Sequence, residues 1–172
     1  PKDEQKLPEK YNIPPAKNGA KIAFVIDDAG LNVANLKKYT SLPFKLTIAV
    51  LPKLSHTKDC AYVVRSSGQE LILHQPIHSL NLNLFPGPGA IMPDMNTYEI
   101  AQLVKENLSE LGPNVKGMNN HEGSLISENE IKIGVVLDVA FENNIYFLDS
   151  RTTAGTKAPQ AALERDMTIY ER

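Results

Sequence analysis

Adjacent carboxylates at the end of an apolar run are the first residues in this sequence that could do chemistry. Asp27 and Asp28 directly follow residues 22–26, whose apolar character predicts a buried strand. Two carboxylates at such a position are costly unless a cation or hydrogen bonds compensate them. The pair therefore predicts a metal-binding or catalytic site, or a solvated turn in which one aspartate caps the next helix.

Two histidines four residues apart follow another apolar run. His74 and His78 flank Gln75-Pro76-Ile77. On a continuous strand, positions four apart would lie about 13 Å from each other, too far to share one ion. Pro76 predicts a break that lets the chain turn and brings both imidazoles to one side, and on a helical turn the same spacing is one that zinc sites use. The alternative is a pair of ordinary loop histidines.

Two more polar clusters follow later apolar runs. Asn119, Asn120 and His121 lie among glycines, where amides and an imidazole are suited to bind sugar hydroxyls or to stabilise an oxyanion. They are equally suited to a hydrogen-bonded turn. Asp149 and Arg151 either orient a catalytic group or form an ion pair that closes a loop.

One Zn²⁺ ion, or another divalent transition metal, would unify these side chains. An aspartate and two histidines supply three protein ligands and leave a fourth position for water, which is typical of catalytic zinc sites. Such a metal lowers the pKa of its water to about 7. A second carboxylate that does not bind the metal can then take the water's proton. The two adjacent aspartates would therefore have different roles.

Short apolar runs predict the strands that must bring these residues together. They lie at residues 22–26, 46–51, 71–73, 115–118, 145–148 and 167–170. Most are continuously apolar, which is typical of parallel strands buried on both faces. In folds built from such strands, function gathers where strands end and loops begin.

Helical patterns lie between the predicted strands. Asn96 and Glu99 resemble a capping box at the start of one helix. Ser127 and Glu130 predict the start of another. Weaker patterns predict helices at residues 33–40, 56–67 and 157–164. The alternation of strands and helices predicts an α/β fold with a mostly parallel sheet, open or closed into a barrel.

The composition is that of one globular domain. The chain has 172 residues, of which 42% are hydrophobic and 22% charged. Residues 1–20 are polar and proline-rich and predict a linker or irregular arm, and residues 21–172 predict the α/β domain. The net charge of −2 gives no electrostatic case for nucleic acid as a partner. No run approaches the roughly 20 apolar residues of a transmembrane helix.

Five segments, in order along the chain, resemble the polysaccharide deacetylase superfamily and more closely its divergent branch. They are FVIDDAG (24–30), LPFKLTIAVLP (42–52), the strand ending in His74, GMNNHEGS (117–124) and FLDSRTT (147–153). The fourth and fifth are quite specific to the branch. The resemblance implies a distorted (β/α) barrel of about six to seven mostly parallel strands, with a metal at its mouth.

The resemblance also implies roles for individual residues. Asp27 corresponds to the catalytic base and Asp28 to a metal ligand. His74 and His78 correspond to the two histidine ligands. His121 belongs to the motif of the divergent branch, where it would replace His78 as a ligand or act as a general acid. The expected ligand set is Asp28, His74 and His78.

Two departures from the superfamily pattern bear on function. The usual Arg-x-Pro motif is absent, which weakens any transfer of substrate specificity. The chain also ends at Arg172, before a later strand that carries another active-site histidine in the family. Six predicted strands do not close a seven-stranded barrel, so we expect either a missing tail or a truncated example.

The leading hypothesis is a metal-dependent hydrolase that removes acetyl groups from N-acetylated sugars of a cell-envelope or extracellular polysaccharide. An extracytoplasmic location follows from the resemblance alone. The second hypothesis is a non-catalytic carbohydrate-binding or scaffold protein that keeps the fold. The third is a Mg²⁺-dependent phosphotransfer domain built on Asp27 and Asp28, which predicts oxygen-only coordination.

Overall fold

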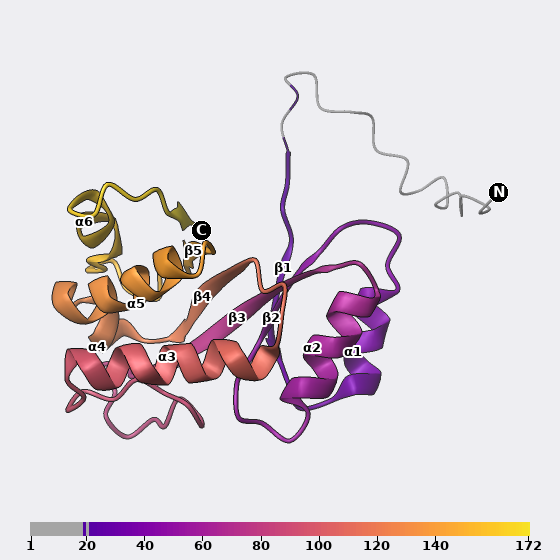
Figure 1. Cartoon of the computed structure of the whole chain (residues 1–172), viewed down its shortest axis with the longest axis horizontal. Coiled ribbons are helices and arrows are strands. Elements are labelled where there is room, and N and C mark those ends of the chain that lie inside the picture. Colours follow the sequence, from indigo (N-terminus) through magenta and orange to yellow (C-terminus); the bar gives the residue numbers. More distant parts are fainter. Residues whose placement is uncertain (1–18, 20) are drawn as a thin grey trace.

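Strands and helices alternate along the chain in the computed structural model, which describes residue 19 and residues 21–172 (Figure 1). The predicted arm at residues 1–20 lies outside the described residues except for Gly19. The strands are β1 (Val25–Ala29), β2 (Thr47–Val50), β3 (Glu70–Ile77), β4 (Gly117–Glu122), β5 (Tyr146–Asp149) and β6 (Tyr170–Glu171). The helices are α1 (Val33–Thr40), α2 (Thr57–Ser66), α3 (Thr97–Leu111), α4 (Ser124–Ser127), α5 (Glu130–Glu142) and α6 (Ala158–Leu163).

All six strands form one parallel sheet whose spatial order is the order of the chain, β1-β2-β3-β4-β5-β6. The predicted α/β fold with parallel strands is therefore confirmed. Among the described residues β6 does not pair with β1, so the sheet is open. Because every strand runs in the same direction, the carboxyl ends of all six lie at one edge, where the polar residues of the sequence are brought together.

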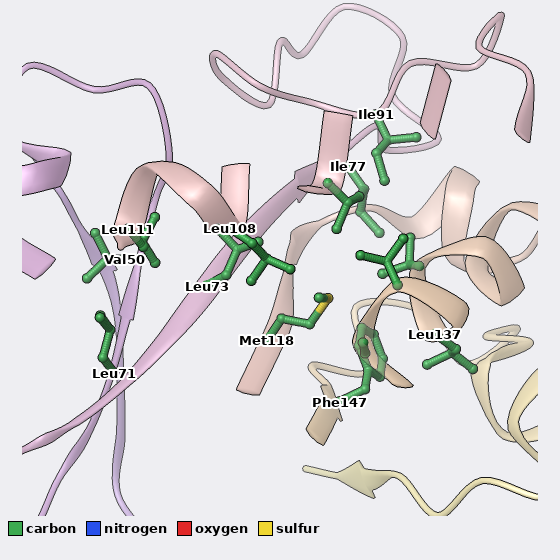
Figure 2. Close-up of a cluster of buried hydrophobic side chains, with 14 of the residues drawn as sticks. Val50, Leu71, Leu73, Ile77, Ile91, Leu108, Leu111, Met118, Leu137 and Phe147 are labelled. Carbon is green, nitrogen blue, oxygen red and sulfur yellow. The ribbon is translucent and has the colours of Figure 1, made fainter. Parts of the chain in front are cut away.

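The hydrophobic core lies between the sheet and the long helices. Figure 2 shows Leu73, Met118 and Phe147 from three neighbouring strands in one cluster with Leu108 of α3 and Leu137 of α5. Burying a side chain of this size stabilises the fold by about 1.5–3 kcal/mol. None of the helices in the described part of the chain combines the length and apolar character that crossing a bilayer requires.

The helix starts agree with the sequence in one case and differ in another. The capping box at Asn96 and Glu99 is present, with the Asn96 side chain accepting a hydrogen bond from the backbone N–H of Glu99. The predicted start at Ser127 is wrong. Ser127 ends the short helix α4, and Asn129 caps α5 by accepting a hydrogen bond from the backbone N–H of Lys132.

Pro76 lies inside β3, and the predicted break at this residue is wrong. The backbone nitrogen of Pro76 faces the side of β3 that pairs with β2. On that side β2 ends at Val50, which pairs with Leu73, so β2 does not reach Pro76. No strand therefore needs the N–H that proline lacks. Beyond β2, only an isolated bridge continues on that side, in which the N–H of Ile91 donates to the carbonyl of Pro76 at 3.0 Å. The extended run consequently continues to Ile77.

Gly123, which follows β4, is expected to tolerate no larger residue. Its φ is +93°, and a Cβ atom added there would lie 1.9 Å from the side chain of Ile77. Gly123→Ala would combine a left-handed backbone with overpacking, each of which costs about 1–3 kcal/mol. Chemical denaturation should show a loss of at least about 2 kcal/mol in the free energy of unfolding. Gly87→Ala is the control, because Gly87 also has a positive φ but open space around it.

Candidate metal centre

A distortion at the end of β1 turns both aspartates toward β3. The register between β1 and β2 shifts around Asp27 and Asp28, and Asp28 has a φ of +63°. On a regular strand, successive side chains point to opposite faces. Here Asp28 Oδ1 lies 3.2 Å from His74 Nε2, and Asp27 Oδ1 lies 4.0 Å from His74 Nδ1. The alternative of a helix-capping aspartate is wrong, because Asn32 caps α1.

β3 and β4 present their polar residues to the same side of the sheet. His74 directly follows Leu73, and Asn119 directly follows Met118, so the polar side chains point away from the apolar core on the helix side. His74 and Asn119 are partners in the parallel register. His121 lies two residues further along β4 and therefore on the same face.

Three ligand atoms converge at this edge of the sheet. His74 Nε2 lies 3.2 Å from both Asp28 Oδ1 and His121 Nδ1, and His121 Nδ1 lies 3.1 Å from Asp28 Oδ1. Bonds of about 2.0–2.1 Å to a tetrahedral ion place two ligands roughly 3.3 Å apart. The three atoms therefore fit one small cation and leave its fourth position open. Two imidazole nitrogens in the set favour a transition metal over Mg²⁺, which counts against the phosphotransfer hypothesis.

The electrostatic surroundings favour the metal-binding form of each ligand. Contact with the imidazole of His74, whose Nε2 atom lies 3.2 Å from Asp28 Oδ1, holds the pKa of the Asp28 carboxyl below its usual value. Burial, together with the nearby His74, lowers the pKa of His121. Asp28 is therefore an anion and His121 a neutral imidazole at pH 7, as coordination requires. Glu122, whose carboxylate lies near His121, adds another negative charge that favours a bound cation.

Asn119 connects two of the candidate residues. Its side chain is fully buried, and its Oδ1 atom lies 2.8 Å from His74 Nδ1. Its Nδ2 donates a hydrogen bond to Asp27 Oδ1 at 2.9 Å. The sequence predicts a substrate-binding role for Asn119, whereas the structure shows its amide engaged within the site.

Arg172 is a site residue that the sequence analysis does not identify. Its guanidinium pairs with Oδ2 of Asp27, and its backbone N–H donates to the carbonyl of Asp149 at 3.2 Å. Arg172 follows the two-residue strand β6, and the local sequence contains no motif that would mark it. Together, Asn119 and Arg172 contact both carboxylate oxygens of Asp27.

His78 lies outside the group formed by Asp28, His74 and His121. Its side chain is buried, and its Nδ1 lies 2.8 Å from the carbonyl oxygen of Ser79. Because β3 stays extended to Ile77, His78, the first residue after the strand, lies about 13 Å from His74. The ligand set expected with His78 is therefore not the set that the structure brings together.

Asp149 and Arg151 organise the loop after β5. The carboxylate of Asp149 accepts hydrogen bonds from the backbone N–H of Arg151 and the hydroxyl of Thr156, both at 2.8 Å. The Arg151 guanidinium pairs with Glu171 at 2.6 Å instead of with Asp149. The ion pair between Asp149 and Arg151, one of the two alternatives that the sequence leaves open, is therefore not formed. The other alternative, that these residues orient a catalytic group, stays a prediction.

Asn120 links the ends of β4 and β5. Its side chain is buried, with Oδ1 accepting a hydrogen bond from the backbone N–H of Ser150 at 2.8 Å. Its Nδ2 donates to the carbonyl of Glu122 at 3.0 Å. These contacts correspond to the hydrogen-bonded turn that the sequence leaves open as the alternative to substrate binding.

The fold and the site define a parallel α/β protein with a candidate metal centre at the carboxyl edge of its sheet. Comparison with known proteins identifies the family. Residues 24–172 match the divergent polysaccharide deacetylase family, and the chain belongs to it.

Two relatives share most of this chain's length. The uncharacterized protein YibQ of Escherichia coli is 30% identical over 152 residues, which are 88% of this chain and 47% of that protein. An uncharacterized protein of Haemophilus influenzae is 23% identical over 159 residues, which are 89% of this chain and 54% of that protein. The chain thus spans about half the length of these relatives.

Solved structures support the fold. The crystal structure of the uncharacterized protein ATU2773 from Agrobacterium tumefaciens superposes with a TM-score of 0.74 at 18% identity, covering 87% of this chain and 61% of that one. A lactam utilization protein from Thermus thermophilus superposes with a TM-score of 0.62 at 12% identity, covering 88% of this chain and 66% of that one. At these identities the likeness concerns the fold alone.

Proposed function

We propose that this chain is a metal-dependent hydrolase that removes acetyl groups from N-acetylated sugars of an extracytoplasmic polysaccharide. The observation that carries the proposal is the convergence of Asp28 Oδ1, His74 Nε2 and His121 Nδ1 within 4.8 Å of one another. Membership of the divergent polysaccharide deacetylase family supports the reaction and the substrate class. The extracytoplasmic location is part of the proposal and follows from that substrate class.

In this proposal Asp28, His74 and His121 would hold a zinc ion, and Asp27 would be the general base. When bound, such an ion supplies a water molecule of lowered pKa and a positive charge beside the carbonyl of the substrate. Asp27 takes the proton of the attacking water as the new C–O bond forms. The same carboxyl then returns the proton to the sugar nitrogen as the C–N bond breaks, releasing acetate and a free amine.

Acetate release tests the proposal. Protein loaded with one equivalent of Zn²⁺ should release acetate from N-acetylglucosamine oligomers or peptidoglycan fragments, and removal of the metal with a chelator should stop the reaction. Asp28→Asn is the matched control, because asparagine tolerates the left-handed backbone of this position while losing the charge. A folded, metal-loaded protein that releases acetate from neither substrate would contradict the proposal.

The second candidate function is a non-catalytic protein that binds carbohydrate. The observation in its favour is the occupation of both Asp27 oxygens by Asn119 and Arg172, which leaves the carboxylate less available as a base. Calorimetric titration with the same oligosaccharides separates the two functions. The non-catalytic function would be favoured if the protein binds the oligosaccharides without releasing acetate and if Asp27→Asn binds them with the same affinity.

A further inference from the structure

A chain of three polar groups runs from Asp27 through Asn119 to His74. The amide of Asn119 lies between the carboxylate and the imidazole, at 2.9 Å from Asp27 Oδ1 and 2.8 Å from His74 Nδ1. Asn119 is 0% exposed and His74 is 3% exposed, so water does not compete with these contacts. The three residues come from β1, β4 and β3, and none of the contacts is local in sequence.

The charge of Asp27 determines which way the amide of Asn119 faces. An ionised carboxylate only accepts hydrogen bonds, so the NH₂ group of the amide must face Asp27. The reversed amide would place its carbonyl oxygen against the carboxylate and lose a charge-assisted hydrogen bond. The amide oxygen therefore faces His74, as the contacts in the structure show.

The amide oxygen in turn determines the tautomer of His74. An oxygen acceptor 2.8 Å from Nδ1 requires that Nδ1 carry the proton. The lone pair of the neutral imidazole is then on Nε2, the atom that lies 3.2 Å from both Asp28 Oδ1 and His121 Nδ1. The tautomer that binds a metal through Nε2 is thus the one that the contact with Asn119 favours.

We infer that Asn119 is a positioning residue that couples the carboxylate of Asp27 to the metal-binding tautomer of His74. The inference rests on the proposed metal centre and deepens it, because Asp27 acquires a second role as the group that orients a ligand through an amide. Metal ligands commonly depend on such a partner at the other ring nitrogen, and changing it lowers metal affinity by about 10–100-fold.

The tautomer of His74 can be observed without metal or substrate. In ¹⁵N-labelled, metal-free protein, at a pH where the imidazole is neutral, long-range ¹H–¹⁵N spectra should show the proton of His74 on Nδ1. Asn119→Leu should give a mixture of tautomers, and Asp27→Asn should do the same, because a neutral amide at position 27 no longer fixes the orientation of Asn119. Wild-type protein with the proton on Nε2 would overturn the inference outright.

Zinc affinity provides the second readout, measured by competition with a chromophoric chelator. Asn119→Leu should bind zinc about 10–100-fold more weakly than wild type. Asn119→Asp keeps an oxygen acceptor for His74 and should therefore keep the tautomer, although it places a second carboxylate beside Asp27. Unchanged tautomer and affinity in Asn119→Leu would contradict the inference.

Asn107→Ala separates positioning from general destabilisation. Asn107 is also a fully buried amide with hydrogen bonds of its own, to Gln75 and Gly89, but it contacts neither His74 nor Asp27. This variant should lower stability and leave the tautomer of His74 unchanged. The NMR readout is also independent of catalysis, so a protein that releases no acetate but shows the predicted tautomers would refute the proposed function and retain this inference.

Discussion

The His121→Ala variant is expected to lose zinc affinity by more than the roughly 10–100-fold that is typical of changes next to a ligand. The reason is geometric, because His121 Nδ1 lies 3.1–3.2 Å from the ligand atoms of Asp28 and His74. Isothermal titration of metal-free protein with Zn²⁺ measures the effect, and thermal unfolding checks that the variant is folded.

His78→Ala is the matched control for this prediction. Its imidazole is buried and contacts the carbonyl of Ser79, so its loss should lower stability without a large change in zinc affinity. The opposite pattern, with zinc affinity lost in His78→Ala and kept in His121→Ala, would restore the ligand set expected from the family resemblance.

The second large effect is expected for Asp27→Asn, which should lower kcat for deacetylation by about 10²–10⁴-fold at saturating zinc. The amide cannot accept the proton of the attacking water, although it fills the same space. Acetate release under single-turnover conditions measures the loss. Asp59→Asn should leave the rate unchanged, because Asp59 is an exposed carboxylate paired with His56. An Asp27→Asn variant with wild-type kcat would exclude Asp27 as the base.

Much of the fold could be predicted from local sequence. Apolar runs predict the number and parallel arrangement of the six strands, because most of these strands are buried and lack a polar side. The first and last runs, at residues 22–26 and 167–170, are placed wrongly: β1 and β6 each begin three residues later, Ile22 and Phe24 are exposed, and so are both residues of β6. The capping box at Asn96 is also local, since it depends on residues three positions apart. The error at Ser127 arose because a second capping signal, at Asn129, lies two residues further along and starts the longer helix.

The site could be predicted only in part. Asp28 and His74 can be identified from the sequence because both lie at the end of an apolar run. The choice between His78 and His121 as the third ligand depends instead on whether β3 bends. Pro76 indicates a bend, because proline cannot donate a hydrogen bond to a neighbouring strand. In the structure β2 ends before it reaches Pro76, so β3 stays extended through this residue. This information lies in the pairing of strands and is absent from the spacing of the histidines.

The role of Asn119 and the contact of Arg172 depend on long-range geometry. Asn119 meets Asp27 across 92 positions of the chain, and Arg172 meets Asp27 across 145. The sequence identifies an amide beside a histidine, but it does not indicate which groups the amide contacts. The distortion that turns Asp27 and Asp28 to one side is also a property of the folded strand.

The coordination of a bound zinc ion tests the central claim most directly. A crystal structure of the zinc-loaded protein, with anomalous data at the zinc edge, should show one ion about 2.0–2.2 Å from Asp28 Oδ1, His74 Nε2 and His121 Nδ1. An ion bound elsewhere, or one held by His78 in place of His121, would contradict the account.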